Sequence, residues 1–426
     1  MRKDLVRLRD RILGTAGIAD NPDSFWVRAG QSMRQYNFIG LLGSMTISAI
    51  PDIARPVMQH GLRPWARGLA NLAGHWGTTR IARQQLKAAG IGLEMVLNTR
   101  ASSLAELTDL YARKTLFERG LRAASDQFSV WTLMAPWNNA LKSFAGIVAS
   151  DEFLRVATKA AAGKASKREI AKLARAGIDD DMAKIIGQAF EQFGDVTDGV
   201  RLPNAQHWPR AAREAYLAAI AKDVDSVIIT PGAADRPGFM DHEFGKLAGQ
   251  FKSFAFAANN RLMISGLQQR DMAAASGALM MIALGMASHG IREKLKGKEV
   301  EMDPAKLLVE GIDRSGITGL LFDVNNTMGK IGGPSVQKLL GTESKRYASR
   351  GAIGALFGPS VDRIDDLTHL AGEYGGAVTG EGEITAKTIE RTRKLLPFQN
   401  LFYLRAILDA GGAQDALIDA LGAPVR

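Results

Sequence analysis

The sequence predicts an all-α protein, an elongated multi-helix assembly joined by Gly- and Pro-rich connectors. Nearly every apolar pattern repeats with helical spacing, and clusters of Gly, Pro, Asn and Asp separate one pattern from the next. A β-branched run of strand length is confined to VDSVIIT (224–230), and an extended linker explains that run equally well. Helix is therefore expected to exceed strand by far.

Two consecutive helices carry their own start and stop signals in KASKREIAKLARAGIDDDMAKIIGQAF (164–190). Ser166 and Glu169 predict a capping box, and Gly177 predicts a left-handed cap at the end of the first helix. Three aspartates at 179–181 suit the positive end of the second helix dipole. The pair has a helix-turn-helix outline, but these carboxylates would repel DNA phosphates, so an ordinary αα-hairpin is favoured.

Three breaks divide the chain: loop-rich LPNAQHWP (202–209), turn-dense ITPGAADRPGF (229–239) and charged REKLKGKEVEMDP (292–304). No fixed-period repeat accompanies them. We expect an amino-terminal helical region at 1–201, a central helical region with an apolar segment at 202–303, and a carboxy-terminal helical region at 304–426.

Composition limits the classes of partner. The 426 residues are 46% hydrophobic and 23% charged, which is enough apolar material for two or three cores. The formal net charge of +10 is spread along the chain, which favours a polyanionic partner such as nucleic acid or an acidic membrane surface, although an ordinary basic protein would look the same. The absence of cysteine excludes disulfides, thiolate metal sites and a cysteine nucleophile.

Motifs for catalysis, cofactors or metals are not found. The glycines of GKIGGPSVQKLLG (329–341) lack the lysine with which a nucleotide-binding loop reaches a phosphate. The histidines form no His-x-x-x-His pair that would hold zinc on a helix face. They are His60, His75, His207, His242, His289 and His369.

The segment TESKRYASRGAIGALFG (342–358) resembles the Glu-Ser start and Gly-Ala-x-Gly continuation of lytic transglycosylases, in which one glutamate protonates the glycosidic oxygen. Glu343 would be that acid. The spacing from Glu343 to Gly351 is shorter than the family pattern, and Leu356 and Phe357 replace the Met-Gln that normally follows. A solvated carboxylate at a helix end is therefore favoured, and peptidoglycan cleavage is kept as an alternative.

The stretch GQFKSFAFAANNRLMISGLQQRD (249–271) predicts a helix that is apolar on two sides. Such a helix needs neighbours on both sides, as in a layered bundle or an oligomer. We expect its large apolar residues to form a packing or oligomer interface. They are Phe251, Phe254 and Leu262 on one face and Phe256, Met263 and Leu267 on the other.

Twenty residues without a formal charge follow, at 272–291, about the length that crosses a bilayer core. Gly and Ser dilute the Leu, Met and Ile content, so a lone helix would insert poorly, but small residues permit close helix packing in lipid. A helix buried in a soluble core is the competing interpretation. We expect burial in a stored form and membrane contact after release, with 38–50 as a second candidate. The predicted contact residues are Leu279, Met280, Met281, Ile282 and Leu284.

The segment 249–291 resembles the carboxy-terminal region of large internal virion proteins of short-tailed bacteriophages, the ejection or core proteins. GIDRSGITGLLFDV (311–324), GALFGPSVDRIDDL (354–367) and KLLPFQNLFYLRAILDA (394–410) are similar to segments that follow in the same order. RQYNFIGLLGSMTISAIPDIA (34–54) is similar to a further segment.

This resemblance implies a protein that is packaged inside the capsid, leaves with or before the genome, and rebuilds into a channel across the host envelope. It implies a homo-oligomer whose partners are other ejection, portal or tail proteins, with contact to genomic DNA and anionic membrane and with no cofactor or small-molecule substrate. Many relatives carry an added enzymatic domain that this sequence lacks, so we expect a non-enzymatic role. Two other classes stay open: a peptidoglycan-cleaving enzyme and a DNA-binding packaging or scaffolding protein.

Overall fold

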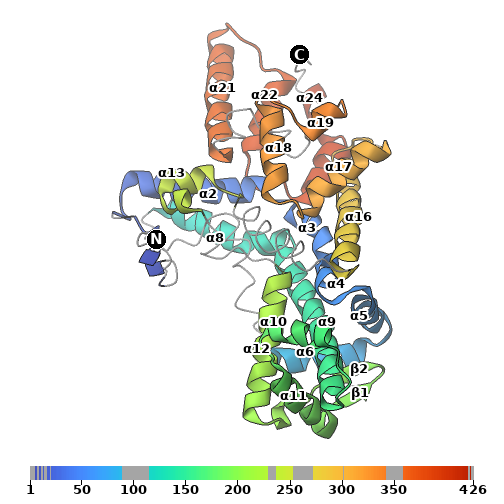
Figure 1. Ribbon diagram of the computed structural model, residues 1–426. Helices are drawn as coiled ribbons and strands as arrows, with labels where there is room; N and C mark the ends of the chain where they lie inside the picture. The colour runs from blue at the N-terminus through green and yellow to red at the C-terminus, as the bar shows by residue number, and fades with distance from the viewer. Residues whose placement is uncertain are drawn as a thin grey trace.

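The computed structural model describes residues 5–6, 9–10, 13, 17–19, 21–88, 115–228, 237–252, 272–300, 302–341, 358–420 and 423. It confirms the predicted all-α class, because the regular elements in these residues are helices apart from one short hairpin. The molecule is elongated (Figure 1). A helical lobe lies at one end, the carboxy-terminal helices lie at the other, and the amino-terminal helices lie between them.

The lobe at one end, here called the lower lobe, is built around one long helix, α9 (Figure 1). The shorter helices α5, α6, α10, α11 and α12 all contact it. The bounds are α5 (Leu62–Gly74), α6 (Trp76–Ala88), α9 (Met134–Ala161), α10 (Lys167–Ala176), α11 (Asp180–Phe193) and α12 (Arg210–Val227).

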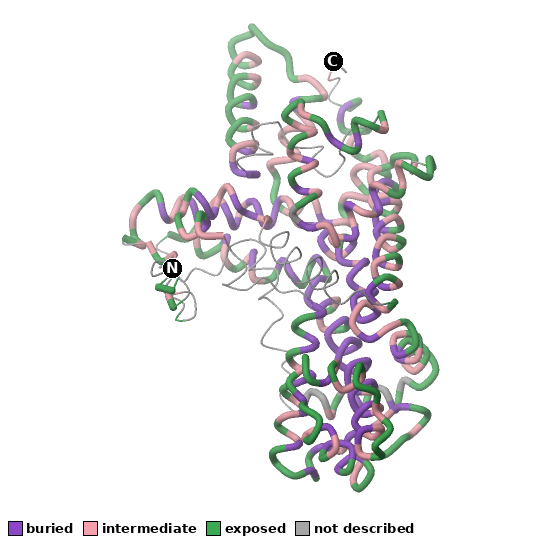
Figure 2. The backbone as a smooth tube through the Cα atoms, in the orientation of Figure 1, coloured by how far each residue is buried: buried purple, intermediate pink, exposed green. Residues whose placement is uncertain are grey.

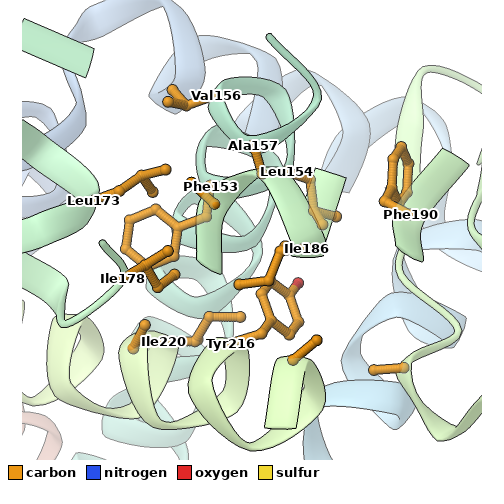
Figure 3. Close-up of a cluster of buried hydrophobic side chains, with 14 of the residues drawn as sticks. Phe153, Leu154, Val156, Ala157, Leu173, Ile178, Ile186, Phe190, Tyr216 and Ile220 are labelled. Carbon is orange, nitrogen blue, oxygen red and sulfur yellow. The ribbon is translucent and has the colours of Figure 1, made fainter. Parts of the chain in front are cut away.

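The core of the lower lobe is continuous and almost wholly apolar. Side chains from α9, α11 and α12 point toward one another, among them Leu154, Ile186 and Tyr216 (Figure 3). The buried hydroxyl of Tyr216 is 2.7 Å from that of Ser150, so its polar end is hydrogen-bonded. Gly187 of α11 allows the closest approach, because a β-carbon there would lie 2.2 Å from a carbonyl oxygen of α9.

The predicted helix caps are confirmed. The Ser166 hydroxyl accepts the Glu169 amide, and the Glu169 carboxylate accepts the Ser166 amide at 3.0 Å. Gly177 has φ +103° and ends α10 in the left-handed region. Asp179 accepts the Met182 amide at 2.8 Å and starts α11. The αα-hairpin interpretation of 164–190 therefore describes the local structure correctly.

Strands β1 (Asp195–Thr197) and β2 (Val200–Leu202) form an antiparallel hairpin across the turn Asp198-Gly199. The run at 224–230, interpreted as either a strand or an extended linker, is helical up to Val227. The helix persists there because Val224 and Val227 continue the helical spacing of the residues before them and are buried in the same core.

The boundary expected between residues 201 and 202 falls inside β2. Beyond it, the short helix η2 (Ala205–His207) and α12 belong to the same core as α9. The described residues of 134–228 thus share one core across that boundary.

The middle of the molecule holds a sharply bent amino-terminal segment. Helix α2 (Phe25–Leu41) and the following helices to His60 meet at an angle of 76°. Salt bridges at 2.5 Å and 2.6 Å join Arg28 to Glu118 and Arg34 to Glu243, and these tie α2 to α8 and α13. The other elements here are α3 (Met45–Ser48), η1 (Ile50–Ala54), α4 (Arg55–His60), α8 (Leu116–Trp131), η4 (Gly238–Asp241) and α13 (Glu243–Ala248).

Helix α16 (Met272–Leu295) packs along this bent segment and against α17 (Pro304–Ser315). Two glycines permit the contact. A β-carbon at Gly277 would lie 2.5 Å from the Met58 amide nitrogen, and one at Gly285 would lie 2.3 Å from the Gly311 carbonyl oxygen. The small residues of this segment therefore permit close helix packing.

The carboxy-terminal helices pack differently from those of the lower lobe. Many of their buried side chains are polar, whereas many large apolar side chains are exposed. Helix α21 projects from the rest and is exposed along much of its length (Figure 2). The elements are α18 (Leu320–Lys330), α19 (Val336–Leu339), α21 (Pro359–Thr379), α22 (Ala386–Leu395), α23 (Phe402–Arg405), the π-helical turn η6 (Ala406–Ala410) and α24 (Ala413–Ala420).

Candidate functional site

Two features stand out as candidate sites: the apolar helix α16 and a charged cavity near its carboxyl end. Helix α16 has 24 residues, which corresponds to about 36 Å. That length exceeds the roughly 30 Å of a bilayer core. It is the one helix among the described residues that is long and apolar enough to cross a membrane, and a third of its apolar window is buried. The bent pair formed by α2 and 45–60 passes the same test when its two arms are counted as one span.

The five predicted membrane-contact residues do not share one face of α16. Leu279 is 70% exposed, whereas Met281 is 0% exposed and packs beside Ala54. Met280, Ile282 and Leu284 are half-buried at the edges of that contact. Of these five residues Leu279 is the most exposed, whereas Met281 holds α16 to the bent segment.

The outer face of α16 is an uncharged stripe, here called the α16 stripe. Its members recur every three or four residues, as one face of a helix requires. None of them carries a charge or a hydrogen-bonding side chain. They are the exposed residues Met272, Ala275, Leu279, Ala283, Ala287 and Ile291.

The inner face of α16 is held by polar groups as well as by packing. The buried Ser288 hydroxyl donates to the Ile47 carbonyl oxygen at 2.8 Å. His289 is fully buried, with its Nδ1 3.4 Å from a Glu310 carboxylate oxygen, and Arg314 Nε lies 3.8 Å from the same oxygen. These contacts join the uncharged segment to α3 and α17 and make its inner face specific for the present neighbours.

The second feature is a cavity of about 840 Å³ where the carboxyl ends of α2 and α16 meet the carboxy-terminal helices. Its described lining holds nine basic and seven acidic side chains, drawn from segments that are distant in the sequence. The volume lies in the range typical of small-molecule sites. The near balance of charge distinguishes it from a uniformly positive groove.

Most cations whose pairing is described in this cavity have acidic partners. Arg393 and Arg405 share the carboxylate of Asp409, and Lys394 lies 2.9 Å from Glu390. Burial lowers the pKa of Lys296, and its hydrogen bond to Glu293 opposes that shift. The cavity wall is therefore largely an ion-pair network.

Arg363 of α21 packs against an aromatic ring. Its side chain lies over the Tyr36 ring, 4.8 Å from the ring centroid, and the residue is only 3% exposed. Neither Nη1 nor Nη2 has a hydrogen-bond acceptor in the described part of the chain. Burial lowers the pKa of Arg363, and the nearby Tyr36 and Asp366 oppose that shift.

Several predicted site residues lie outside the described residues. Phe251 is described, but it is in a turn at φ +71° and packs beside the Phe38–Phe128 cluster, so it does not begin a helix as predicted. The others are Phe254, Phe256, Leu262, Met263, Leu267 and the candidate acid Glu343. In the described ranges, no three His, Asp or Glu side chains gather in a way that would hold a metal ion.

No protein-family model matches the chain, and neither a curated protein nor a solved structure is significantly similar to it. The resemblance to phage ejection proteins therefore remains a hypothesis that depends on the sequence motifs.

Proposed function

We propose that this chain is a non-enzymatic internal virion protein of a short-tailed bacteriophage. It is stored inside the capsid and leaves with or before the genome. It then forms part of an oligomeric core or channel that helps deliver DNA across the host envelope.

The α16 stripe carries this proposal. A soluble helix usually turns charged residues outward, yet the outward face of α16 has none over six positions. Its inner face is occupied by the bent segment and α17. A helix of bilayer length with one packed face and one uncharged face fits a protein that is stored folded and later meets lipid.

A second apolar surface supports self-assembly. Helix α21 exposes Ile364, Leu367, Ala371, Tyr374 and Val378, which alternate spacings of three and four residues. This is the spacing of a coiled-coil seam, here called the α21 seam. Tyr374 also contacts α22 through Thr392, but Val378 is 88% exposed. A second copy or another ejection protein would bury this seam.

The experiment that tests the membrane role uses the absence of native cysteine. A fluorophore attached through Leu279→Cys lies on the α16 stripe, and one attached through Leu339→Cys lies on an exposed position of α19. With anionic liposomes, we expect a blue shift and quenching by lipid-borne quenchers at residue 279 and neither at residue 339. A third label, at Met281→Cys, becomes quenched only if α16 separates from its present neighbours.

A charged substitution provides the matched control. Leu279→Asp should reduce flotation with the vesicles at least about tenfold, because a carboxylate at the middle of a membrane helix costs roughly 2.5 to 3.5 kcal/mol. Its circular dichroism should match that of the wild type.

No shift, no quenching and no flotation in the wild type would contradict the membrane role. Salt-sensitive DNA binding without flotation would favour a packaging protein, and muralytic activity abolished by Glu343→Gln would favour an enzyme.

A further inference from the structure

Helix α10 carries the densest positive charge of the lower lobe. Its segment KASKREIAKLAR (164–175) holds five basic side chains and one acidic side chain. Residues 168, 172 and 175 follow the spacing of one helical face, and two lysines precede them at the amino end of the helix. Lys172 is half-buried, and the other four cations are exposed. The five side chains, here called the α10 basic face, are Lys164, Lys167, Arg168, Lys172 and Arg175.

Most basic side chains elsewhere in the lower lobe are neutralised by carboxylates. The paired residues are Lys142, Arg155, Lys159, Lys184, Arg201 and Arg210. Glu169, the one acidic residue of the segment, is held by Arg155 at 3.1 Å and by Lys159 at 2.8 Å. Among the described residues, Lys164, Lys167 and Lys172 form no salt bridge. Side chains of like charge three or four residues apart repel one another, so an outside anion would stabilise this face.

The dimensions of the α10 basic face suit a phosphate backbone. From Lys167 to Arg175 the helix rises about 12 Å. Duplex DNA presents one phosphate charge for about every 1.7 Å of its axis, so several phosphates lie within reach of a row of this length. The other exposed residues of the helix are Ala171 and Ala174, whose small side chains allow a backbone to approach closely.

The same face lacks what a membrane-surface helix needs. Such helices place Trp, Phe or Leu beside their cations and bury these apolar side chains among the lipid headgroups. Helix α10 exposes no large apolar side chain. The α16 stripe, which is proposed to meet lipid, belongs to a helix outside the lower lobe (Figure 1). The observations therefore favour a nucleic acid over a lipid surface as the partner of α10.

Acidic side chains limit where the duplex can lie. Asp180 and Asp181 begin α11, beyond the carboxyl end of α10, and Lys184 lies 2.7 Å and 3.3 Å from their carboxylates. One lysine leaves part of this negative charge in place, which disfavours entry of α11 into a major groove. Contact is then made with the backbone toward the Lys164 end of α10, where it carries no base-sequence information.

We propose that the α10 basic face is a non-specific docking surface for the phosphate backbone of duplex DNA. The lysines and arginines each neutralise a phosphate, and no base is read. This inference deepens the proposed function and rests on it for the source of the DNA, which is the stored genome. The binding itself is separate from membrane contact by the α16 stripe.

Fluorescence anisotropy of a short labelled duplex with the full chain tests this proposal over a series of salt concentrations. The logarithm of the affinity should fall against the logarithm of the salt concentration with a slope of about −3 to −5, since about four or five side chains each release a counterion. A triple variant with Lys164→Gln, Lys167→Gln and Lys172→Gln should bind about 10- to 100-fold more weakly at physiological salt, with a slope shallower by about 2 to 3. Two duplexes of unrelated sequence should bind equally well.

A second triple variant controls for net charge. Lys294→Gln, Lys338→Gln and Lys387→Gln remove the same charge from exposed lysines outside the lower lobe and should leave the affinity and the slope nearly unchanged. The proposal is overturned if the wild type fails to bind the duplex at low salt, or if the two triple variants weaken binding equally.

Flotation with anionic vesicles separates this proposal from the membrane role. The α10 triple variant should float as the wild type does, because the α16 stripe is intact in it. Lost flotation with unchanged DNA binding would assign the α10 basic face to lipid and overturn the proposal. A wild type that binds DNA through this face but never floats would support the proposal and contradict the membrane role.

Discussion

The lower lobe and the carboxy-terminal region distribute their side chains in opposite ways. Between residues 134 and 228, the large apolar side chains meet in one core, and the polar ones are mainly exposed. Between residues 302 and 420, few large apolar side chains are buried, while Asp313, Asn326 and Gln337 are buried in a hydrogen-bonded chain. Many of its Leu, Ile and Val side chains are exposed.

This difference separates two sources of stability. Apolar burial stabilises a helix pair in isolation, so the lower lobe has what it needs within one chain. A region that buries amides and exposes aliphatic side chains gains less from folding alone and more from association. The lower lobe thus buries its apolar side chains within one chain, whereas the carboxy-terminal region leaves many exposed, as the proposed oligomer would require.

The largest expected effect is in the core of the lower lobe. Leu154→Ala removes a fully buried side chain from α9 and should lower the free energy of unfolding by about 2 to 5 kcal/mol. Leu339→Ala removes an exposed side chain from the carboxy-terminal region and should change it by less than about 0.5 kcal/mol. Urea denaturation followed by circular dichroism measures both, and equal effects would remove the contrast between the regions.

The α21 seam provides the next test. Replacing both Leu367 and Val378 with Asp should raise the concentration at which the assembly dissociates at least about tenfold, because two carboxylates would have to be buried. Thr368→Asp is exposed on the same helix but off the seam and should have little effect. Light scattering over a concentration series measures the molar mass of the assembly and shows where it dissociates. A stable monomer at every concentration, with and without virion partners, would contradict the oligomer.

The smallest effect concerns a cap in the lower lobe. Burial alone would raise the pKa of Glu169, but hydrogen bonds from Lys159, Ser166 and Arg155 outweigh it and lower the pKa from 4.5 to about 2. A lowered folded-state pKa contributes stability above about pH 4.5, and this contribution is lost as the pH falls toward 2.

Glu169→Gln should therefore cost about 1 kcal/mol at neutral pH, and the difference from wild type should shrink below pH 4.5. Glu191→Gln alters an exposed glutamate on α11 and serves as the control. Denaturation midpoints at several pH values report the trend, and a cost that grows toward low pH would refute the assigned hydrogen bonds.

Structural features that depend on neighbouring residues were predicted well from the sequence. The caps at Ser166 and Gly177 depend on residues within a few positions of each other and formed as predicted, and α11 begins at the predicted aspartates, with Asp179 as its cap. The hairpin was missed although Asp198-Gly199 is a strong turn signal, because its strands have only three residues each. The run at 224–230 was interpreted as a strand or linker because it is rich in β-branched residues, but such residues also fit a helix with a buried face.

Features that depend on distant segments could not be predicted. The α16 segment was recognised by its missing charges, but which of its residues face inward depends on Ala54 and Met58, more than two hundred positions away. The cavity is assembled from at least four separate segments, and nothing local to Arg363 indicates that it packs over the Tyr36 ring. Phe251 fits an apolar helical pattern, yet the chain turns at that residue.

The content of phage particles tests the central claim most directly. Virions and particles emptied by triggered ejection are compared by immunoblot for this chain, with the major capsid protein as the loading reference. The proposed function predicts that the protein is present in intact virions and missing from emptied particles. Equal amounts in both, or none in either, would contradict a stored protein that leaves with the genome.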